Sequence, residues 1–169
     1  AAGAGVAHCP ISNSYFANAV FPMARALEAG LRVGLGSDIA GGSQSSIFRQ
    51  CEHAVTVSRM LDDGVDASIS STRRGVPGSR VDIPTAFWAA TAGAAELLGI
   101  PAGVLSEGHV FDAIAVDIGP SSSTGVWTDF DDWPRIFEKM VRSTNGSDIN
   151  HVWVNGREVI APIDDSAHS

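Results

Sequence analysis

The sequence predicts an α/β fold followed by a smaller β layer. A short apolar stretch, Leu31–Leu35, runs into a glycine-lined turn, which is typical of a buried strand of a parallel sheet. Apolar residues with helical spacing precede it over residues 18–29, after an earlier strand signal, so that the order is strand, helix, strand. Near the C-terminus, alternating residues and an Asn-Gly pair at 155–156 predict an antiparallel hairpin. We therefore expect two parts, residues 1–104 and residues 105–169.

The turn after this strand presents a single carboxylate, Asp38. Ligands of α/β folds bind outside the carboxyl ends of parallel strands, and Asp38 occupies such an end. Gly36, Gly41 and Gly42 bracket it, and glycine permits positive φ or a close approach of the backbone to a ligand. This pattern favours a functional carboxylate. An ordinary turn is the alternative, because Asp and Gly are also common turn residues.

The chain begins with a small apolar stretch, Ala1–Ala7, that predicts a buried strand. The run His-Cys-Pro-Ile-Ser-Asn at 8–13 predicts that this strand breaks into a loop, because proline disfavours helix in the residue before it. His8 is the first candidate ligand, although a histidine at a strand end is more often a hydrogen-bonded structural residue. The helix predicted over 18–29 ends at Gly30.

A second helix is predicted from about Ile47 to Leu61, with Ser45 or Ser46 as its cap. It carries Glu52-His53, but no second ligand follows four residues later, so that the pattern does not support a zinc motif on this helix.

The segment Asp62–Arg80 has no periodicity and predicts a loop. Its arginines, Arg73, Arg74 and Arg80, are most simply interpreted as solvated, with the steering of an anion as the alternative.

The remaining helices and strands are predicted from the positions of proline and glycine and from the alternation of apolar and polar residues. Pro84 opens an alanine-rich helix that continues to Leu98 and ends at Gly99. The other expected elements are a strand at Val110–Ile118, a helix at Trp133–Val141, a hairpin at His151–Ile160 and a frayed tail from Ala161.

Composition limits the possible partners. The 169 residues carry a formal charge of −8, which argues against nucleic acid and anionic membranes, since both require clustered Lys and Arg. No apolar run approaches the length of a bilayer span, and the first residues lack the basic start of a signal peptide. The two cysteines, Cys9 and Cys51, do not make a disulfide framework, so that we expect a reducing compartment, the cytoplasm.

Four segments in this order resemble the C-terminal part of the amidohydrolase superfamily. They are Val-Ala-His-Cys-Pro-Ile-Ser-Asn at 6–13, Val-Gly-Leu-Gly-Ser-Asp-Ile-Ala-Gly-Gly at 33–42, Glu-Gly-His-Val-Phe-Asp-Ala at 107–113 and Val-Trp-Val-Asn-Gly at 152–156. The resemblance implies the C-terminal portion of a (β/α)₈ barrel, with strands of a small β-sandwich domain after it. Within the superfamily the match is best to members that deaminate guanine.

The resemblance also implies an activity and a cofactor. The activity is metal-dependent hydrolytic deamination of guanine to xanthine and ammonia, with a small purine as the partner. Asp38 would bind the catalytic zinc and shuttle a proton, whereas His8 would lie near the site without binding the metal. The metal-binding histidines of the family would all precede Ala1, so that the chain is expected to be a C-terminal fragment. It would form a homo-oligomer or associate with the missing half.

Two alternatives stay open from the sequence. The first is another amidohydrolase that acts on a different heterocycle, such as a triazine. The second is a non-catalytic fragment, because one carboxylate cannot replace the three or more protein ligands of a catalytic zinc.

Overall fold

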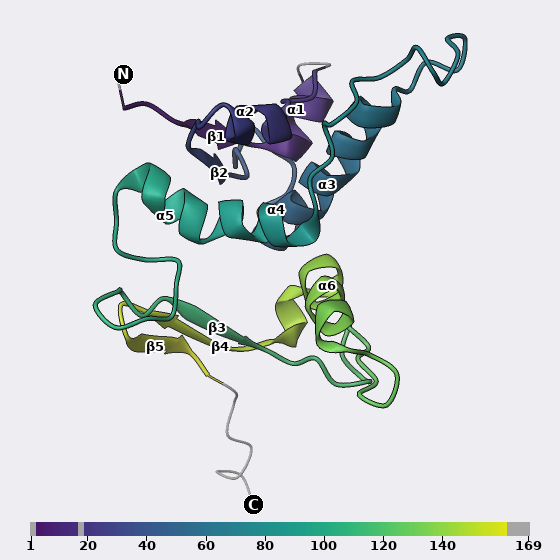
Figure 1. Ribbon diagram of the computed structural model, residues 1–169. Helices are drawn as coiled ribbons and strands as arrows, with labels where there is room; N and C mark the ends of the chain where they lie inside the picture. Colours follow the sequence, from purple (N-terminus) through teal and green to yellow (C-terminus); the bar gives the residue numbers. More distant parts are fainter. Residues whose placement is uncertain (1–2, 17–18, 162–169) are drawn as a thin grey trace, which may run out of the picture. The chain divides into compact units, whose positions relative to one another are not determined.

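The computed structural model describes residues 3–16 and 19–161, and the chain divides into two compact units, residues 1–101 and 102–169. Unit 1 holds a parallel strand pair with its helices, and unit 2 holds a three-stranded sheet with a further helix (Figure 1). No helix within the described ranges is both long enough and apolar enough for a membrane span. The tail predicted to fray lies outside these ranges from residue 162 onward.

The sheet of unit 1 is a pair of short parallel strands, as predicted. β1 (Val6–His8) and β2 (Val33–Leu35) pair in register, from Val6↔Val33 to His8↔Leu35. The pairing extends one residue further, because the Gly36 N–H donates to the His8 carbonyl oxygen at 2.9 Å. Since the strands are parallel, the segments that follow them both start at the carboxyl ends of the strands, on the same side of the sheet.

The residues after β1 correct one prediction. The run at 8–13 was expected to be a loop, but α1 (Pro10–Phe16) begins one residue after Cys9. Pro10 is the first residue of the helix, where its missing N–H needs no partner, and the Asn13 N–H donates to the Cys9 carbonyl oxygen at 2.8 Å. The proline therefore begins a helix here instead of preventing one.

The other helices of unit 1 lie near their predicted positions with changed bounds. They are α2 (Met23–Glu28), α3 (Ile47–Asp63), α4 (Ile83–Ala90) and α5 (Ala92–Leu98). The continuous alanine-rich helix that was predicted is broken at Thr91, whose φ of −123° and ψ of −95° are not helical. Its hydroxyl donates to the Phe87 carbonyl oxygen at 2.8 Å and so satisfies an acceptor at the break.

Glycine lets α5 approach β2 closely. A Cβ atom added to Gly34, in the middle of β2, would lie 3.0 Å from the Ala94 Cα atom. The apolar spacing of α3 predicts one face formed by Ile47, Phe48, Cys51, Ala54, Val55 and Ser58. All of these are less than 9% exposed except Ile47, which is 36% exposed. The core of unit 1 therefore forms where α3, α4 and α5 cover β2.

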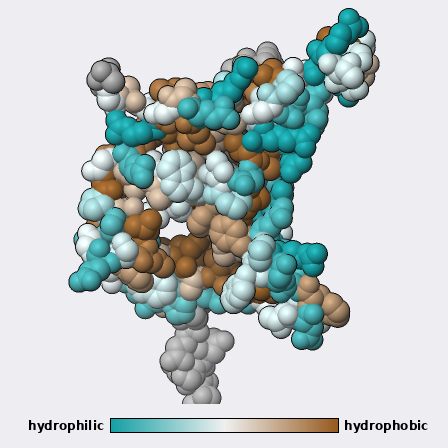
Figure 2. All heavy atoms as spheres, viewed as in Figure 1, coloured by the Kyte–Doolittle hydropathy of each residue, from teal (hydrophilic) through white to brown (hydrophobic). Residues whose placement is uncertain are grey.

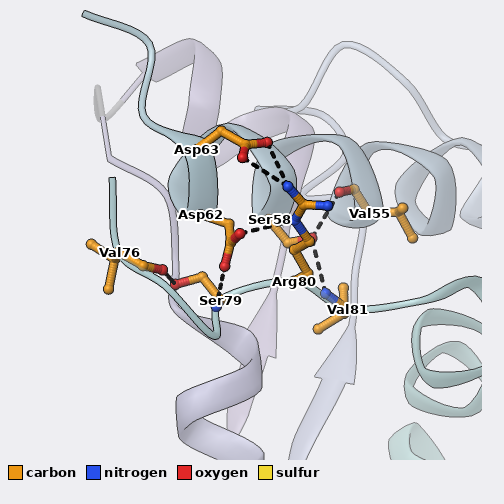
Figure 3. Close-up of polar contacts among 8 residues, drawn as sticks. All are labelled: Val55, Ser58, Asp62, Asp63, Val76, Ser79, Arg80 and Val81. Atoms are coloured by element: carbon orange, nitrogen blue, oxygen red, sulfur yellow. Dashed lines mark hydrogen bonds and ion pairs between the residues drawn. The ribbon is translucent and has the colours of Figure 1, made fainter. Parts of the chain in front are cut away.

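The segment after α3 is anchored to the end of that helix (Figure 3). Arg80 Nε donates to Asp62 Oδ2 at 2.9 Å, and Arg80 Nη2 donates to Asp63 Oδ1 at 2.7 Å. The Ser79 N–H donates to Asp62 Oδ1 at 2.9 Å, and this bond is the main reason that the pKa of Asp62 lies below its usual value. The Val81 N–H donates to Ser58 Oγ at 3.1 Å. Arg80 is thus a structural anchor and not a freely solvated cation.

Unit 2 is built on an antiparallel sheet in the order β3–β4–β5. These strands are β3 (Ala113–Val116), β4 (Ile149–Val154) and β5 (Arg157–Ile160), and β3 is shorter than the strand predicted there. Asn155 and Gly156 connect β4 to β5 with φ angles of 51° and 76°, so that the predicted hairpin is confirmed. The helix α6 (Trp133–Ser143) precedes β4.

Unit 1 carries large apolar side chains at its surface. Tyr15 and Phe16, at the end of α1, are 74% and 62% exposed, and their ring centroids lie 4.7 Å apart. Figure 2, which draws the whole chain, shows patches of hydrophobic surface in brown among hydrophilic surface in teal. Within the described residues, β1 and β2 each pair on one side alone, and sheets seldom leave such edges open. Further strands could therefore extend this sheet.

The cap of α4 provides a stability test. Asp82 Oδ1 accepts a hydrogen bond from the Thr85 N–H at 2.9 Å. We expect Asp82→Ala to lower the free energy of unfolding by about 1 kcal/mol, because the first turn loses an acceptor for an unpaired N–H group. Asp82→Asn should keep most of this stability, since its side-chain oxygen can accept the same bond. Urea unfolding followed by circular dichroism measures both, and an unchanged Ala variant would contradict the cap.

Candidate functional site

Asp38 lies three residues beyond β2, exposed to solvent. Its own backbone has φ 55°, a conformation that Asp adopts more readily than most residues. The glycines around it do not take up positive φ, as the sequence had suggested they could. They allow close contacts instead: a Cβ atom added to Gly41 would lie 2.9 Å from Asp38 Oδ2. The turn is thus folded tightly around the carboxylate.

A hydroxyl from the first turn of α1 binds this carboxylate. Ser12, in α1, is buried, and its Oγ donates to Asp38 Oδ2 at 2.7 Å. The Gly42 N–H donates to the Asp38 carbonyl oxygen, so that backbone and side chain are both held. The two residues are 26 positions apart in sequence and meet because β1 and β2 are parallel. Sequence reasoning missed Ser12, although it stands in the run at 8–13 that carried the family resemblance.

His8 is placed as a structural residue. It is 2% exposed, its Nδ1 lies 3.2 Å from Asn13 Oδ1, and its ring centroid is 5.0 Å from that of Phe21. Burial lowers the pKa of His8 to about 4, against the opposing effect of the hydrogen bond to Asn13. The imidazole is therefore neutral at neutral pH, and its Nδ1 is engaged by Asn13 and not by Asp38.

Cys9 and Gln50 complete the surroundings of the strand ends. Burial raises the pKa of the Cys9 thiol, and the nearby negative charge of Asp38 raises it further. Gln50, in α3, is fully buried: its Oε1 accepts from the Ile11 N–H at 3.3 Å, and its Nε2 donates to the Gln44 carbonyl oxygen at 3.0 Å. This one amide links α1 to the segment that follows Asp38. Periodicity placed Gln50 off the apolar face of α3 and so gave no signal for this role.

His53 lies on a separate, polar surface between α1 and α3. Its Nε2 is 2.7 Å from Ser14 Oγ, and burial lowers the pKa of His53. A cavity of about 410 Å³ adjoins it, lined among others by Gln44 and by the ion-paired Arg49 and Glu52. Nothing in these contacts connects His53 to Asp38.

The described residues provide one side chain, that of Asp38, which is suited to bind a divalent metal ion. Residues 3–16 and 19–161 contain no cluster of three or more His, Cys, Asp and Glu side chains that could hold an ion. Asp38 is an exposed carboxylate whose Oδ2 is oriented by Ser12, which suits one oxygen ligand of a divalent metal. The described residues therefore fit part of a metal site and do not form a complete one.

The family is shown by comparison with known proteins. A family model described as "Amidohydrolase family" matches residues 1–159, and the chain belongs to that family. It is 34% identical over 160 residues to a probable guanine deaminase of Schizosaccharomyces pombe, covering 92% of this chain and 28% of that protein. It is 30% identical over 156 residues to a 5-methylthioadenosine/S-adenosylhomocysteine deaminase of Haloquadratum walsbyi, covering 92% of this chain and 31% of that protein.

Solved structures agree on the fold. A guanine deaminase from C. acetobutylicum with bound guanine superposes with a TM-score of 0.75 at 23% identity, over 94% of this chain and 34% of that one. A zinc complex of atrazine chlorohydrolase TrzN from Arthrobacter aurescens gives a TM-score of 0.63 at 24% identity, over 96% of this chain and 33% of that one. The predicted fold class, a part of the amidohydrolase fold, is confirmed, and the chain spans about a third of these proteins.

The buried imidazole of His8 predicts a pH dependence of stability. The unfolded chain binds a proton at His8 near pH 6.5, but the folded chain does so only near pH 4. Between these values the unfolded state holds more protons, so that the stability contributed by neutral His8 falls as the pH falls from about 6.5 to about 4. Comparison of urea unfolding at pH 7 and pH 5 should show a smaller loss in His8→Gln, which cannot titrate. An equal loss in both proteins would contradict the neutral buried state.

Proposed function

We propose that this chain supplies the C-terminal part of a metal-dependent hydrolase that deaminates guanine to xanthine and ammonia. The observation that carries the proposal is an exposed Asp38, held by Ser12 at the carboxyl end of β2, in a chain that belongs to the amidohydrolase family. The similarity to a probable guanine deaminase of S. pombe supports guanine as the substrate. The open edges of the β1–β2 sheet support its completion by further strands.

Zinc is the proposed cofactor, because the superposed TrzN structure is a zinc complex. Asp38 would be one ligand, and the others would come from outside the described residues. When bound, zinc lowers the pKa of a water molecule to about 7, which supplies a nucleophile at neutral pH.

Asp38 is also the proposed general base and acid. Its carboxylate can accept the proton of the attacking water and later return it to the leaving amine, which requires one well-placed group. The exposure of Asp38 allows access to both partners. The glycine-containing turn after it would let the backbone pass close to a flat purine.

A second candidate is deamination of a different heterocycle. The similarity to the 5-methylthioadenosine/S-adenosylhomocysteine deaminase of H. walsbyi, at 30% identity, favours this alternative. The carboxylate chemistry would be the same, and the substrate would differ. Turnover of guanine, adenosine derivatives and triazines by the intact enzyme separates the candidates: turnover of guanine alone supports the first, and turnover of another compound with guanine inert overturns it.

Two substitutions of Asp38 distinguish its role in metal binding from its role in proton transfer. In the intact enzyme, Asp38→Asn keeps a side-chain oxygen that can bind metal but cannot accept a proton. We expect it to retain part of the zinc and to lose roughly 10²–10⁴-fold in kcat, the usual contribution of a general acid or base. Asp38→Ala should lose zinc and activity together. Elemental analysis and steady-state kinetics measure both, and full turnover by Asp38→Asn would exclude the proton shuttle.

The 169-residue chain by itself should neither bind zinc tightly nor deaminate guanine. Asp38 is one ligand, and a catalytic zinc needs at least three from the protein. A partial barrel also exposes the site to water, which weakens its electrostatic interactions. Zinc analysis of the chain, purified from a strain that lacks guanine deaminase, and the loss of guanine absorbance provide the test. One zinc per chain together with turnover would show that other residues of this segment complete the site.

A further inference from the structure

The hydrogen bond between Ser12 and Asp38 joins α1, which follows β1, to the turn that follows β2. We propose that Ser12 is a positioning residue for the metal site: its hydroxyl holds the Asp38 carboxylate in the orientation that binds zinc. This inference rests on the proposed role of Asp38 as a ligand. Ser12 acts through Asp38 and is not assigned any contact with substrate.

Ser12 is well held for this role. It is buried in the first turn of α1, which follows β1 after a single residue. The adjacent Ile11 N–H is bound by the fully buried Gln50 of α3, and the side chain of Asn13 is paired with the buried His8. The donor therefore belongs to a part of unit 1 that is anchored on both sides.

Asp38, by contrast, lies on an exposed turn, and its side chain can rotate about two bonds unless a contact fixes it. Oδ2 accepts from Ser12 at 2.7 Å, and the same oxygen faces the Cβ-free side of Gly41, where an added Cβ atom would lie 2.9 Å away. Ser12 thus holds Oδ2, and the missing Cβ atom of Gly41 leaves the space that Oδ2 occupies. Within the described residues this leaves Oδ1 as the oxygen without a protein donor, and it is the oxygen available to a metal.

The chain offers a matched control on the same helix. Ser14 also carries a hydroxyl on α1, which donates to the Pro10 carbonyl oxygen at 2.8 Å and lies 2.7 Å from His53 Nε2. Ser14→Ala removes the same atom as Ser12→Ala, two residues along, without touching Asp38. A general effect on α1 would appear in both variants, whereas an effect on the carboxylate would appear in Ser12→Ala alone.

The experiment measures zinc affinity of the intact enzyme by competition with a chelator, alongside kcat and KM for guanine. Groups that orient a metal ligand typically contribute 10–100-fold in metal affinity. We expect Ser12→Ala to bind zinc roughly 10–100-fold more weakly and, when saturated with zinc, to lose kcat with little change in KM. Ser14→Ala should bind zinc like the wild type, and Ser12→Thr, which keeps the hydroxyl, should recover at least part of the affinity. Wild-type zinc affinity in Ser12→Ala, or equal losses in Ser12→Ala and Ser14→Ala, would overturn the proposal.

A double-mutant cycle tests whether Ser12 acts through Asp38. In an Asp38→Asn background, which keeps part of the zinc, the Ser12 hydroxyl no longer meets a charged carboxylate, so that Ser12→Ala should cause a smaller further loss of zinc affinity than in the wild type. A loss of the same factor in both backgrounds would overturn the proposal. These titrations do not depend on guanine. An enzyme that turns over a different heterocycle would refute the proposed substrate and leave the test of Ser12 valid, whereas an intact site in Ser12→Ala with normal guanine turnover would refute only the role of Ser12.

Discussion

The parallel pairing of β1 and β2 is the constraint on which the site depends. Each strand is three residues long, and the pair brings the loops after His8 and after Leu35 to one edge of the sheet. The Ser12 hydroxyl of α1 can then reach the Asp38 carboxylate in the turn after β2, although the two are distant in sequence. Gly34 contributes by letting α5 pack tightly against β2, all three residues of which are buried. An antiparallel arrangement would place these two loops at opposite ends.

The elements that the sequence predicted well have local causes. The apolar run ending at Leu35 identified β2, and the Asn-Gly pair identified the hairpin because its backbone conformation is intrinsic to these residues. The errors arose where one local signal has two outcomes. Pro10 can end one element or begin the next, and it begins α1. The break at Thr91 has neither proline nor glycine at that position. A break that depends on tertiary packing is not marked by any residue of the local sequence.

The site, like the fold, could be predicted from the sequence only in part. Asp38 could be found from its position after a strand and among glycines, but its partner could not, because a contact between Ser12 and Asp38 exists only once both strands are paired. Of the two properties that glycine offers here, positive φ and close approach, the structure uses the second: Asp38 itself adopts positive φ, and the glycines supply space. The carboxylate identifies a type of chemistry and not a substrate. Relatives of this chain are named as deaminases of different purine compounds, so that substrate choice must depend on other residues.

Gln50 places a limit on how the loops of this site can change in length. Its buried amide accepts from the Ile11 N–H of α1 and donates to the Gln44 carbonyl oxygen at the same time. Because Gln50 has a fixed position on α3, both backbone groups must stay where they are. An insertion or deletion between β2 and Gln44 would carry the acceptor away and leave buried polar groups unpaired, which is costly in free energy. In the loop between α3 and Arg80, the Val76 N–H donates to the Leu61 carbonyl oxygen at 2.8 Å and Arg74 Nε donates to the Asp63 carbonyl oxygen at 3.2 Å. The hydrogen bonds of Asp66, Ser68 and Ser70, by contrast, stay within the loop and do not fix its length. Length variation should therefore accumulate in the latter loop, while the connection that carries Asp38 keeps a constant length.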